Sequence, residues 1–129
     1  MHKGILITGA VLGCLAVIFG AFGAHALKNA LDAEAIKTFE TGVKYQMYHA
    51  LLLLFVGSSS VLTTGTKNTI MYLVIAGVIL FSGSIYGLST NALTAFDFKK
   101  IGFVTPIGGT LLIVSWGILI FKFISIKSN

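Results

Sequence analysis

The chain has 129 residues, of which 56% are hydrophobic and 10% charged, and its formal net charge at pH 7 is +5. This composition excludes an ordinary soluble domain, because a domain of this size would leave a large apolar surface in water. All nine basic residues are lysines. Without arginine the chain lacks the side chain that binds phosphate in a bidentate way, so nucleic acid is not an expected partner. The positive charge instead predicts contact between lysines and the anionic head groups of the lipid bilayer.

Four apolar stretches occupy most of the sequence, at about residues 4–27, 43–62, 69–88 and 102–121. A hydrocarbon core about 30 Å thick is crossed by about 20 helical residues. The sequence therefore predicts an all-α integral membrane protein, a four-helix transmembrane bundle that forms a single domain over residues 1–129. Little chain remains outside the spans, so a soluble catalytic module does not fit and the protein is not expected to be an enzyme.

Small residues recur on one face of the first span and on one stripe of the third span. The residues are Gly9, Gly13, Gly20 and Ala24 in the first span, and Gly83 and Gly87 in the third. Small side chains let two membrane helices approach closely. This pattern predicts tight packing of the first span on the third, or a seam between copies in a homo-oligomer.

The segment between the first two spans has the features of a short helix at the membrane surface. Asp32 is a suitable N-cap, and Leu31, Ala35, Phe39 and Val43 fall on one helical face. A helix with a modest apolar face and a charged opposite face is typical of the interface. The stretch at 91–100, with two phenylalanines and two lysines, predicts a second interfacial segment.

The number of lysines does not decide the orientation in the membrane. Four lysines fall on the side of the two termini and five on the other side. Lysine excess marks the cytoplasmic side of membrane proteins. Cytoplasmic termini are the working expectation, and all four acidic residues then lie on the opposite side.

Polar side chains inside the spans gather toward one membrane face. Antiparallel threading brings together the end of span one, the start of span two, the end of span three and the start of span four. The residues are His25, Tyr45, Gln46, Tyr48, His49, Ser82, Ser84, Tyr86 and Thr105. Polar groups at this depth usually face the bundle interior or a wet cavity. Pro106, Gly108 and Gly109 are expected to loosen the fourth helix beside them and to free backbone carbonyls.

Four motifs, in this order, resemble the small membrane proteins grouped as domain of unknown function 423, also called UPF0382. They are residues 20–25 (GAFGAH), 45–49 (YQMYH), 81–86 (FSGSIY) and 105–109 (TPIGG), with Trp116 beyond them. The resemblance covers the whole chain and implies a four-helix protein of the bacterial inner membrane. The chain departs from the family pattern in a longer stretch around 91–100. The family has no established activity, so no residue inherits a role from it.

Three interpretations of the polar side chains remain open. In the first, they form hydrogen bonds between helices, and the protein is a structural or accessory protein whose protein partner is unknown. In the second, they line a cavity that binds or passes a small solute or a proton, with His25 and His49 as titratable groups. In the third, the two histidines ligate a metal or a haem, although no carboxylate or cysteine completes such a site. No metal site and no cofactor are predicted.

Overall fold

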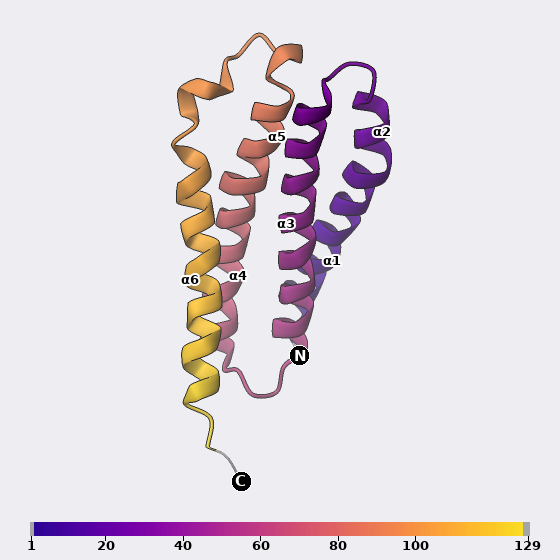
Figure 1. The fold of residues 1–129 in the computed structure, drawn as a ribbon. Helices are drawn as coiled ribbons and strands as arrows, with labels where there is room; N and C mark the ends of the chain where they lie inside the picture. The colour runs from indigo at the N-terminus through magenta and orange to yellow at the C-terminus, as the bar shows by residue number, and fades with distance from the viewer. Residues whose placement is uncertain (1, 128–129) are drawn as a thin grey trace.

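The computed structural model describes residues 2–127, and of Ala24 it describes the backbone alone. The described chain is helical and contains no strand. The helical elements form four long stretches, which run up and down beside one another (Figure 1). Their elements are, in chain order, α1 (Lys3–Ile18), η1 (Phe19–Gly23), α2 (Ala24–Leu27), α3 (Ala33–Ser58), α4 (Thr64–Val78), η2 (Ile79–Gly83), α5 (Ser84–Ser89), η3 (Asn91–Leu93), η4 (Phe98–Ile101) and α6 (Val104–Ile124).

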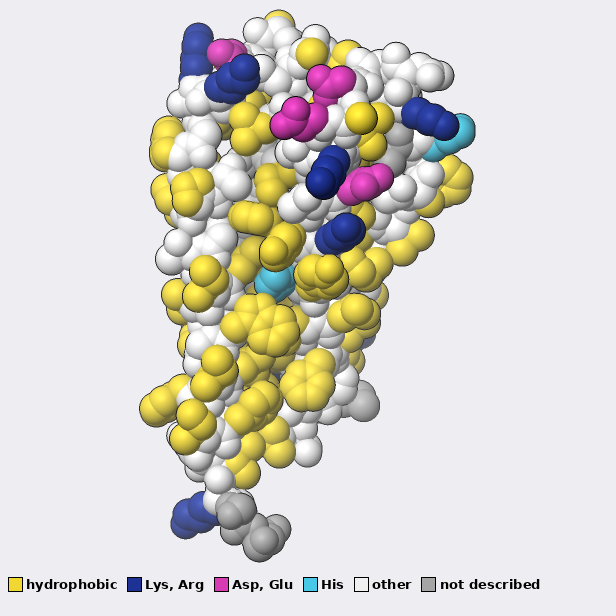
Figure 2. Space-filling view, viewed as in Figure 1, with side chains coloured by type: hydrophobic (Ala, Val, Ile, Leu, Met, Phe, Trp, Pro, Cys, Tyr) yellow, Lys and Arg dark blue, Asp and Glu magenta, His cyan; other side chains and the backbone are white. Residues whose placement is uncertain are grey.

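The start of α1, the end of α6 and the connection from α3 to α4 lie at one end of the bundle, here called the terminal end (Figure 1). The connections at 28–32 and 90–103 lie at the other end, here called the loop end. The space-filling view shows the acidic side chains and most of the visible lysines near the loop end, above a largely hydrophobic surface (Figure 2). This distribution agrees with the antiparallel threading expected from the sequence.

Three of the four stretches are long and apolar enough to cross a membrane: Lys3–Leu27, Thr64–Ser89 and Val104–Ile124. The remaining stretch, α3, has 26 residues but carries more polar side chains. Its charged residues are exposed near the loop end, whereas Gln46 and His49 point inward, where other helices cover them, and each is only 3% exposed. Burial within the bundle therefore removes these groups from lipid, as a polar side chain at membrane depth requires.

The expected interfacial helix between the first two spans is not a separate element. α3 is a single helix that begins at Ala33, and the Asp32 carboxylate caps it by accepting a 2.8 Å hydrogen bond from the Ala35 amide. The Asp32 cap predicted from the sequence is thereby confirmed. The first turns continue into the bundle because Phe39 and Gly42 are buried against other elements. Tertiary packing, rather than the membrane surface, covers the apolar face of this segment.

Two helical stretches contain one wider turn at corresponding places. η1 follows the 16 residues of α1, and η2 follows the 15 residues of α4, each as a five-residue π-helix. A π turn interrupts the regular ladder of backbone hydrogen bonds and often lies near a functional site. Both π turns lie in the half of the bundle nearer the loop end, at the depth where the predicted polar residues gather.

The small face of α1 packs on α3, which corrects the expectation that the first span packs on the third. A Cβ atom added at Gly9 would lie 2.9 Å from the Ala50 carbonyl oxygen, and one at Gly13 would lie 3.6 Å from the Ala50 Cβ. Gly20 faces Val43 in the same way, with 3.2 Å between such a Cβ and Val43 Cγ1. These glycines allow close approach to α3, the second helical stretch, because α3 runs directly beside α1. The side chain of Ala24 lies outside the described structure.

The long connection at 90–103 folds back onto the bundle. The Asn91 side chain accepts a 2.8 Å hydrogen bond from the Phe98 amide and donates a 3.2 Å bond to Asp97. The Phe98 ring then covers Gly87, where an added Cβ would lie 2.6 Å from the ring. The predicted packing glycine at 87 therefore accommodates this connection and not the first span.

Candidate functional site

Gln46 connects three helical stretches at the centre of the polar cluster. Its Nε2 donates a 2.8 Å hydrogen bond to the backbone carbonyl of Leu12 in α1. Its Oε1 accepts a 2.6 Å bond from the hydroxyl of Tyr86 in α5. α3 extends from the loop-end rim into the bundle without a break, so it carries Gln46 between these two partners. Both ends of the amide are thereby engaged within the protein.

The Tyr86 ring of α5 fills the space between η1 and α3. It packs edge-on against Phe19, with 5.4 Å between ring centroids, and in a tilted arrangement against Phe39, with 5.1 Å between centroids. A Cβ atom added at Gly42 would lie 2.7 Å from the Tyr86 ring. A glycine is required at this position because any side chain would displace a ring that aromatic neighbours hold on two sides.

Two serines of the predicted cluster also bridge helices. Ser82 in η2 is fully buried and donates a 2.8 Å hydrogen bond to the Gly42 carbonyl of α3. Ser84 in α5 forms a hydroxyl–hydroxyl bond with Thr105 in α6. The polar side chains of α5 and η2 therefore fasten the third helical stretch to α3 on one side and to α6 on the other.

His49 joins α3 to α6. Its Nδ1 lies 2.7 Å from the Tyr45 carbonyl, and the indole Nε1 of Trp116 donates a 3.1 Å bond to its Nε2. A carbonyl only accepts and an indole N–H only donates, so these partners assign the hydrogen to Nδ1 and leave the lone pair on Nε2. The ring is therefore held as the neutral imidazole, and a proton on Nε2 would break the bond from Trp116.

The two predicted tyrosines of α3 lie on its outer surface. Tyr45 is 41% exposed and Tyr48 is 53% exposed. Tyr45 packs edge-on against Phe81, with 5.0 Å between ring centroids. Together with His49 and Trp116, Tyr45 lines a crevice of about 260 Å³ between α3 and α6. Tyr48 lines a neighbouring, mostly apolar groove of about 480 Å³ along the same two helices.

His25 does not join this cluster. It is exposed and lines a groove of about 860 Å³ between the end of the first helical stretch and the start of α3. His49 faces α6 instead, so the two histidines lie in different hollows with no lining residue in common. Within residues 2–127 no group of three or more histidine, cysteine, aspartate or glutamate side chains is placed to hold a metal ion. The geometry therefore gives no support to a site that both histidines would ligate.

The predicted packing residues near the loop end differ in what they contact. Gly108 lets α6 pack directly against η2, since an added Cβ would collide with the backbone at Leu80 and Phe81. Gly109 faces the Phe81 ring at 3.4 Å, whereas Gly83 has no neighbour within 4 Å of an added Cβ. Pro106 does not loosen the helix, because it lies in the first turn of α6, where a missing amide hydrogen costs no hydrogen bond. That expectation of a weakened fourth helix is corrected.

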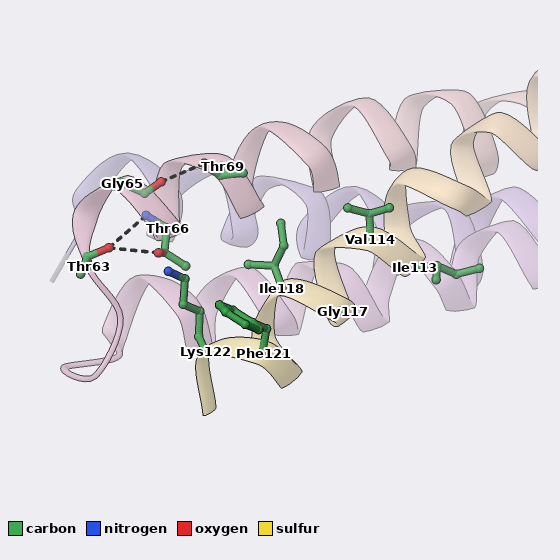
Figure 3. Close-up of a pocket in the computed structure, with 10 residues that line it drawn as sticks. All are labelled: Thr63, Gly65, Thr66, Thr69, Ile113, Val114, Gly117, Ile118, Phe121 and Lys122. Atoms are coloured by element: carbon green, nitrogen blue, oxygen red, sulfur yellow. Dashed lines mark hydrogen bonds between the residues drawn. The ribbon is translucent and has the colours of Figure 1, made fainter. Parts of the chain in front are cut away.

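Another hollow lies at the terminal end, between α4 and α6 (Figure 3). It has a volume of about 870 Å³ and is lined by threonines of the first turns of α4 and by Ile118, Phe121 and Lys122 of α6. Thr63 accepts a 3.2 Å bond from the Thr66 amide and donates a 3.0 Å bond to the Thr66 hydroxyl (Figure 3). These threonine bonds cap α4 and leave no converging set of reactive side chains in the hollow.

Several structural contacts were not foreseen from the sequence. Trp116 of α6 reaches His49 of α3, because both residues lie near the middle of their helices. Lys67 is buried and donates a 2.6 Å bond to the Ser59 carbonyl at the end of α3. His2 lies 2.7 Å from the Asn68 side-chain oxygen and thereby ties the start of α1 to α4. Side-chain partners far apart in sequence leave no periodic signal that would reveal them.

Comparison with known proteins places the chain in a family. The family described as "Protein of unknown function (DUF423)" matches residues 19–109. The chain belongs to this family. It is 44% identical to UPF0382 membrane protein SSP2132 of Staphylococcus saprophyticus over 118 residues, which cover 92% of this chain and 94% of that protein.

Other relatives come from other bacterial genera. The chain is similar to UPF0382 membrane protein YwdK of Bacillus subtilis, with 40% identity over 88% of this chain and 90% of the relative. A UPF0382 membrane protein of Haemophilus influenzae is 36% identical, with 90% of each chain covered. No solved structure matches the chain. The named relatives and the apolar helices together identify a DUF423 chain as an all-helical membrane protein, and the resemblance drawn from its motifs is confirmed.

Proposed function

We propose that this DUF423 protein is a non-catalytic accessory protein of the bacterial inner membrane. The observation that carries the proposal is the state of the polar cluster. Gln46, Ser82, Tyr86 and His49 each form a hydrogen bond to another helix or to the backbone. Among the described residues, no buried side-chain nitrogen or oxygen lacks a partner. Such a network fixes the positions of the helices, and each of these side chains already has a hydrogen-bond partner within the protein.

The directions of two hydrogen bonds support the same conclusion. A general base needs a lone pair directed at a substrate. The Nε2 lone pair of His49 is instead directed at the indole N–H of Trp116. The Tyr86 hydroxyl is likewise directed at Gln46, inside the bundle. The polar cluster therefore supports a structural role for these groups.

Location in the inner membrane is supported by apolar helices and by relatives named as membrane proteins in bacteria that include Haemophilus influenzae. We propose cytoplasmic termini as the orientation to test, since lysines are almost equally divided between the two ends and acidic residues contribute little to orientation. Cysteines introduced at Ser60 and at Ala95, in a Cys14→Ser background, test this orientation in intact cells. A membrane-impermeant maleimide should label position 95 and spare position 60; the reverse pattern would invert the orientation.

The second candidate is binding or passage of a small solute or a proton. The crevice of about 260 Å³ between α3 and α6 favours it, because Tyr45, His49 and Trp116 line this space. His49 would have to exchange its bond to Trp116 for one to the solute. Passage would also need a route through the aliphatic half, where Leu53, Val56, Ile70 and Val74 form a closed core.

Flux through reconstituted liposomes separates the two candidates. Purified protein is placed in liposomes that contain a pH-sensitive dye, and proton entry is compared with that of empty liposomes. Swelling in an isotonic solution of a small neutral solute tests solute entry in the same preparation. The accessory role predicts no flux above the empty control. A saturable flux that His49→Ala abolishes, while the thermal unfolding profile is unchanged, would replace the accessory role with transport.

Self-association was expected through the small-residue faces. α3 covers the Gly9 and Gly13 face of α1 within one chain. We therefore propose that a homo-oligomer, where it forms, uses another surface, and that Gly83, which faces open space, is available to it. Native mass spectrometry of protein released gently from its own membrane reports the number of copies. If a Gly83→Leu variant still assembles, Gly83 is not part of the interface.

A further inference from the structure

The groove at the loop end, between the end of the first helical stretch and the start of α3, is unlike the polar cluster because its charged groups are exposed. It has a volume of about 860 Å³, and its lining includes Lys28, Lys37 and Lys44. This volume lies in the range of cavities that hold small organic ligands. Figure 2 shows lysine side chains around acidic ones near the loop end, with hydrophobic surface directly below them.

The groove exists because the two helical stretches separate toward the loop end. α1 packs closely on α3 at Gly9, whereas α2 stands apart from α3 near the 28–32 connection (Figure 1). The π turn η1 lies between α1 and α2, and its Gly20 still faces Val43 of α3. Gly20 and Ala21 belong to this turn and line the groove, so its inner part has no bulky side chain from the first stretch.

The charges in the groove favour an anion. Three lysines and one carboxylate, Glu40, line it, so these four groups carry a net charge of about +2. Lys37 and Lys44 are seven residues apart and therefore lie on the same face of α3, roughly 10 Å apart along its axis. Within the described residues, the ammonium groups of Lys28, Lys37 and Lys44 have no hydrogen-bond partner, in contrast to Lys67, which donates to the Ser59 carbonyl.

The depth of the groove favours a ligand that is both anionic and apolar. Gly20 precedes Lys28 by eight residues, which places it roughly 12 Å farther into the membrane along a helix. The groove thus runs from a charged rim into the depth of the apolar first span. A soluble anion would use only the rim, whereas a phospholipid would place its phosphate among the lysines and an acyl chain beside Gly20 and Ala21.

We propose that this groove is a binding site for one anionic phospholipid. The phosphate lies among Lys28, Lys37 and Lys44, and an acyl chain lies along Gly20 and Ala21. A lysine near the membrane surface contributes to the binding of anionic lipid, and flexible lysine stems let the ammonium groups reach the head-group level. The proposal goes beyond the accessory role and does not depend on it, because the flux test and the lipid test give separate results.

Native mass spectrometry in a neutral detergent tests the site. The intact protein is titrated with phosphatidylglycerol and, separately, with phosphatidylcholine that carries the same acyl chains. The expected result is that the anionic lipid binds at least about tenfold more tightly. The variant K28Q/K37Q/K44Q should lose this preference. The matched control K99Q/K100Q/K127Q removes the same number of charges outside the groove and should keep it.

Three results would overturn the proposal. Equal loss of preference in the two triple variants would show a diffuse effect of surface charge. Displacement of phosphatidylglycerol by millimolar inorganic phosphate, with phosphate itself retained by the protein, would show a site for soluble anions. Ala21→Phe fills the apolar part of the groove without a change of charge and should weaken binding of both lipids; unchanged binding would remove the acyl chain from the groove.

Discussion

The two sides of α3 treat polar side chains in opposite ways. Toward α1, α5 and α6, Gln46 and His49 are buried and each of their side chains has two partners within the protein. Toward α2, Lys37 and Lys44 are exposed and line an open groove. The same helix therefore carries a closed network on one side and unpaired charges on the other.

This difference separates structural from binding roles. A buried polar group that is fully paired stabilises one arrangement of helices, and its loss leaves the partner unpaired. An exposed charge contributes little to folding, so it is free to recognise something outside the chain. Substitutions on the closed side should therefore change stability, and those on the open side should change binding.

The largest effect is expected from closing the space at Gly42. Gly42→Ala places a methyl group 2.7 Å from the Tyr86 ring, which Phe19 and Phe39 hold in place. We expect a loss of about 2 kcal/mol in the free energy of unfolding. Unfolding by sodium dodecyl sulfate, followed by circular dichroism, measures it. Gly83→Ala is the matched control, since nothing lies within 4 Å of its added Cβ; an equal loss there would contradict the steric explanation.

A smaller loss is expected at Gln46. Gln46→Leu keeps the shape of the side chain and removes the bonds to Leu12 and Tyr86, so unfolding should cost about 1 kcal/mol less. Tyr86→Phe alone should lose about half as much. In the double variant the two losses should not add, because both remove the same bond. Strict additivity of the two losses would argue that this bond does not form in the membrane.

The bond between His49 and Trp116 can be followed by fluorescence. Trp116 is the one tryptophan of the chain, so the emission spectrum reports on its environment alone. His49→Leu removes the acceptor of the indole N–H and should shift the emission to shorter wavelength, with a loss of about 0.6 kcal/mol in stability. His25→Leu, far from the indole, should leave the spectrum unchanged. A spectral shift of the same size in that control would refute the assignment.

The smallest effect on stability is expected on the open side of α3. The variant K28Q/K37Q/K44Q should unfold within about 0.5 kcal/mol of the natural protein, because these exposed side chains make no contact that folding requires. The same unfolding titration measures it, so the variant is compared directly with Gly42→Ala. A loss above 2 kcal/mol would mean that the groove, like the polar cluster, belongs to the structural network.

The elements were predictable to different degrees. The apolar stretches indicated four long helices, and Asp32 indicated the start of α3, because both signals are local. The first turns of α3 were interpreted as a separate interfacial helix, since their charges suggested the membrane surface. What continues the helix is burial of Phe39 and Gly42 under Tyr86, a residue more than forty positions away. A contact at that distance cannot be read from the period of a helix.

The candidate site divides in the same way. The sequence placed Gln46, His49, Ser82, Ser84, Tyr86 and Thr105 near one membrane face, and the structure joins them into bonded groups. It did not indicate that His25 lies apart from His49, because the depth of two residues in a membrane says nothing of the direction in which each side chain points. Rotation of a helix about its axis is set by packing, and packing separated these two histidines.

The sequence alone determined that this protein lies in a membrane, how many long helices it has and at what depth its polar residues lie. These follow from local composition, because about 20 apolar residues suffice to cross a bilayer. Only the tertiary structure decided that α1 packs on α3, that Tyr86 closes over Gly42, and that Trp116 is the partner of His49. Without a hydrophobic drive between helices in lipid, shape and hydrogen bonds select the neighbours. The shape of the contacts and the hydrogen bonds both depend on side chains that come together only after the chain has folded.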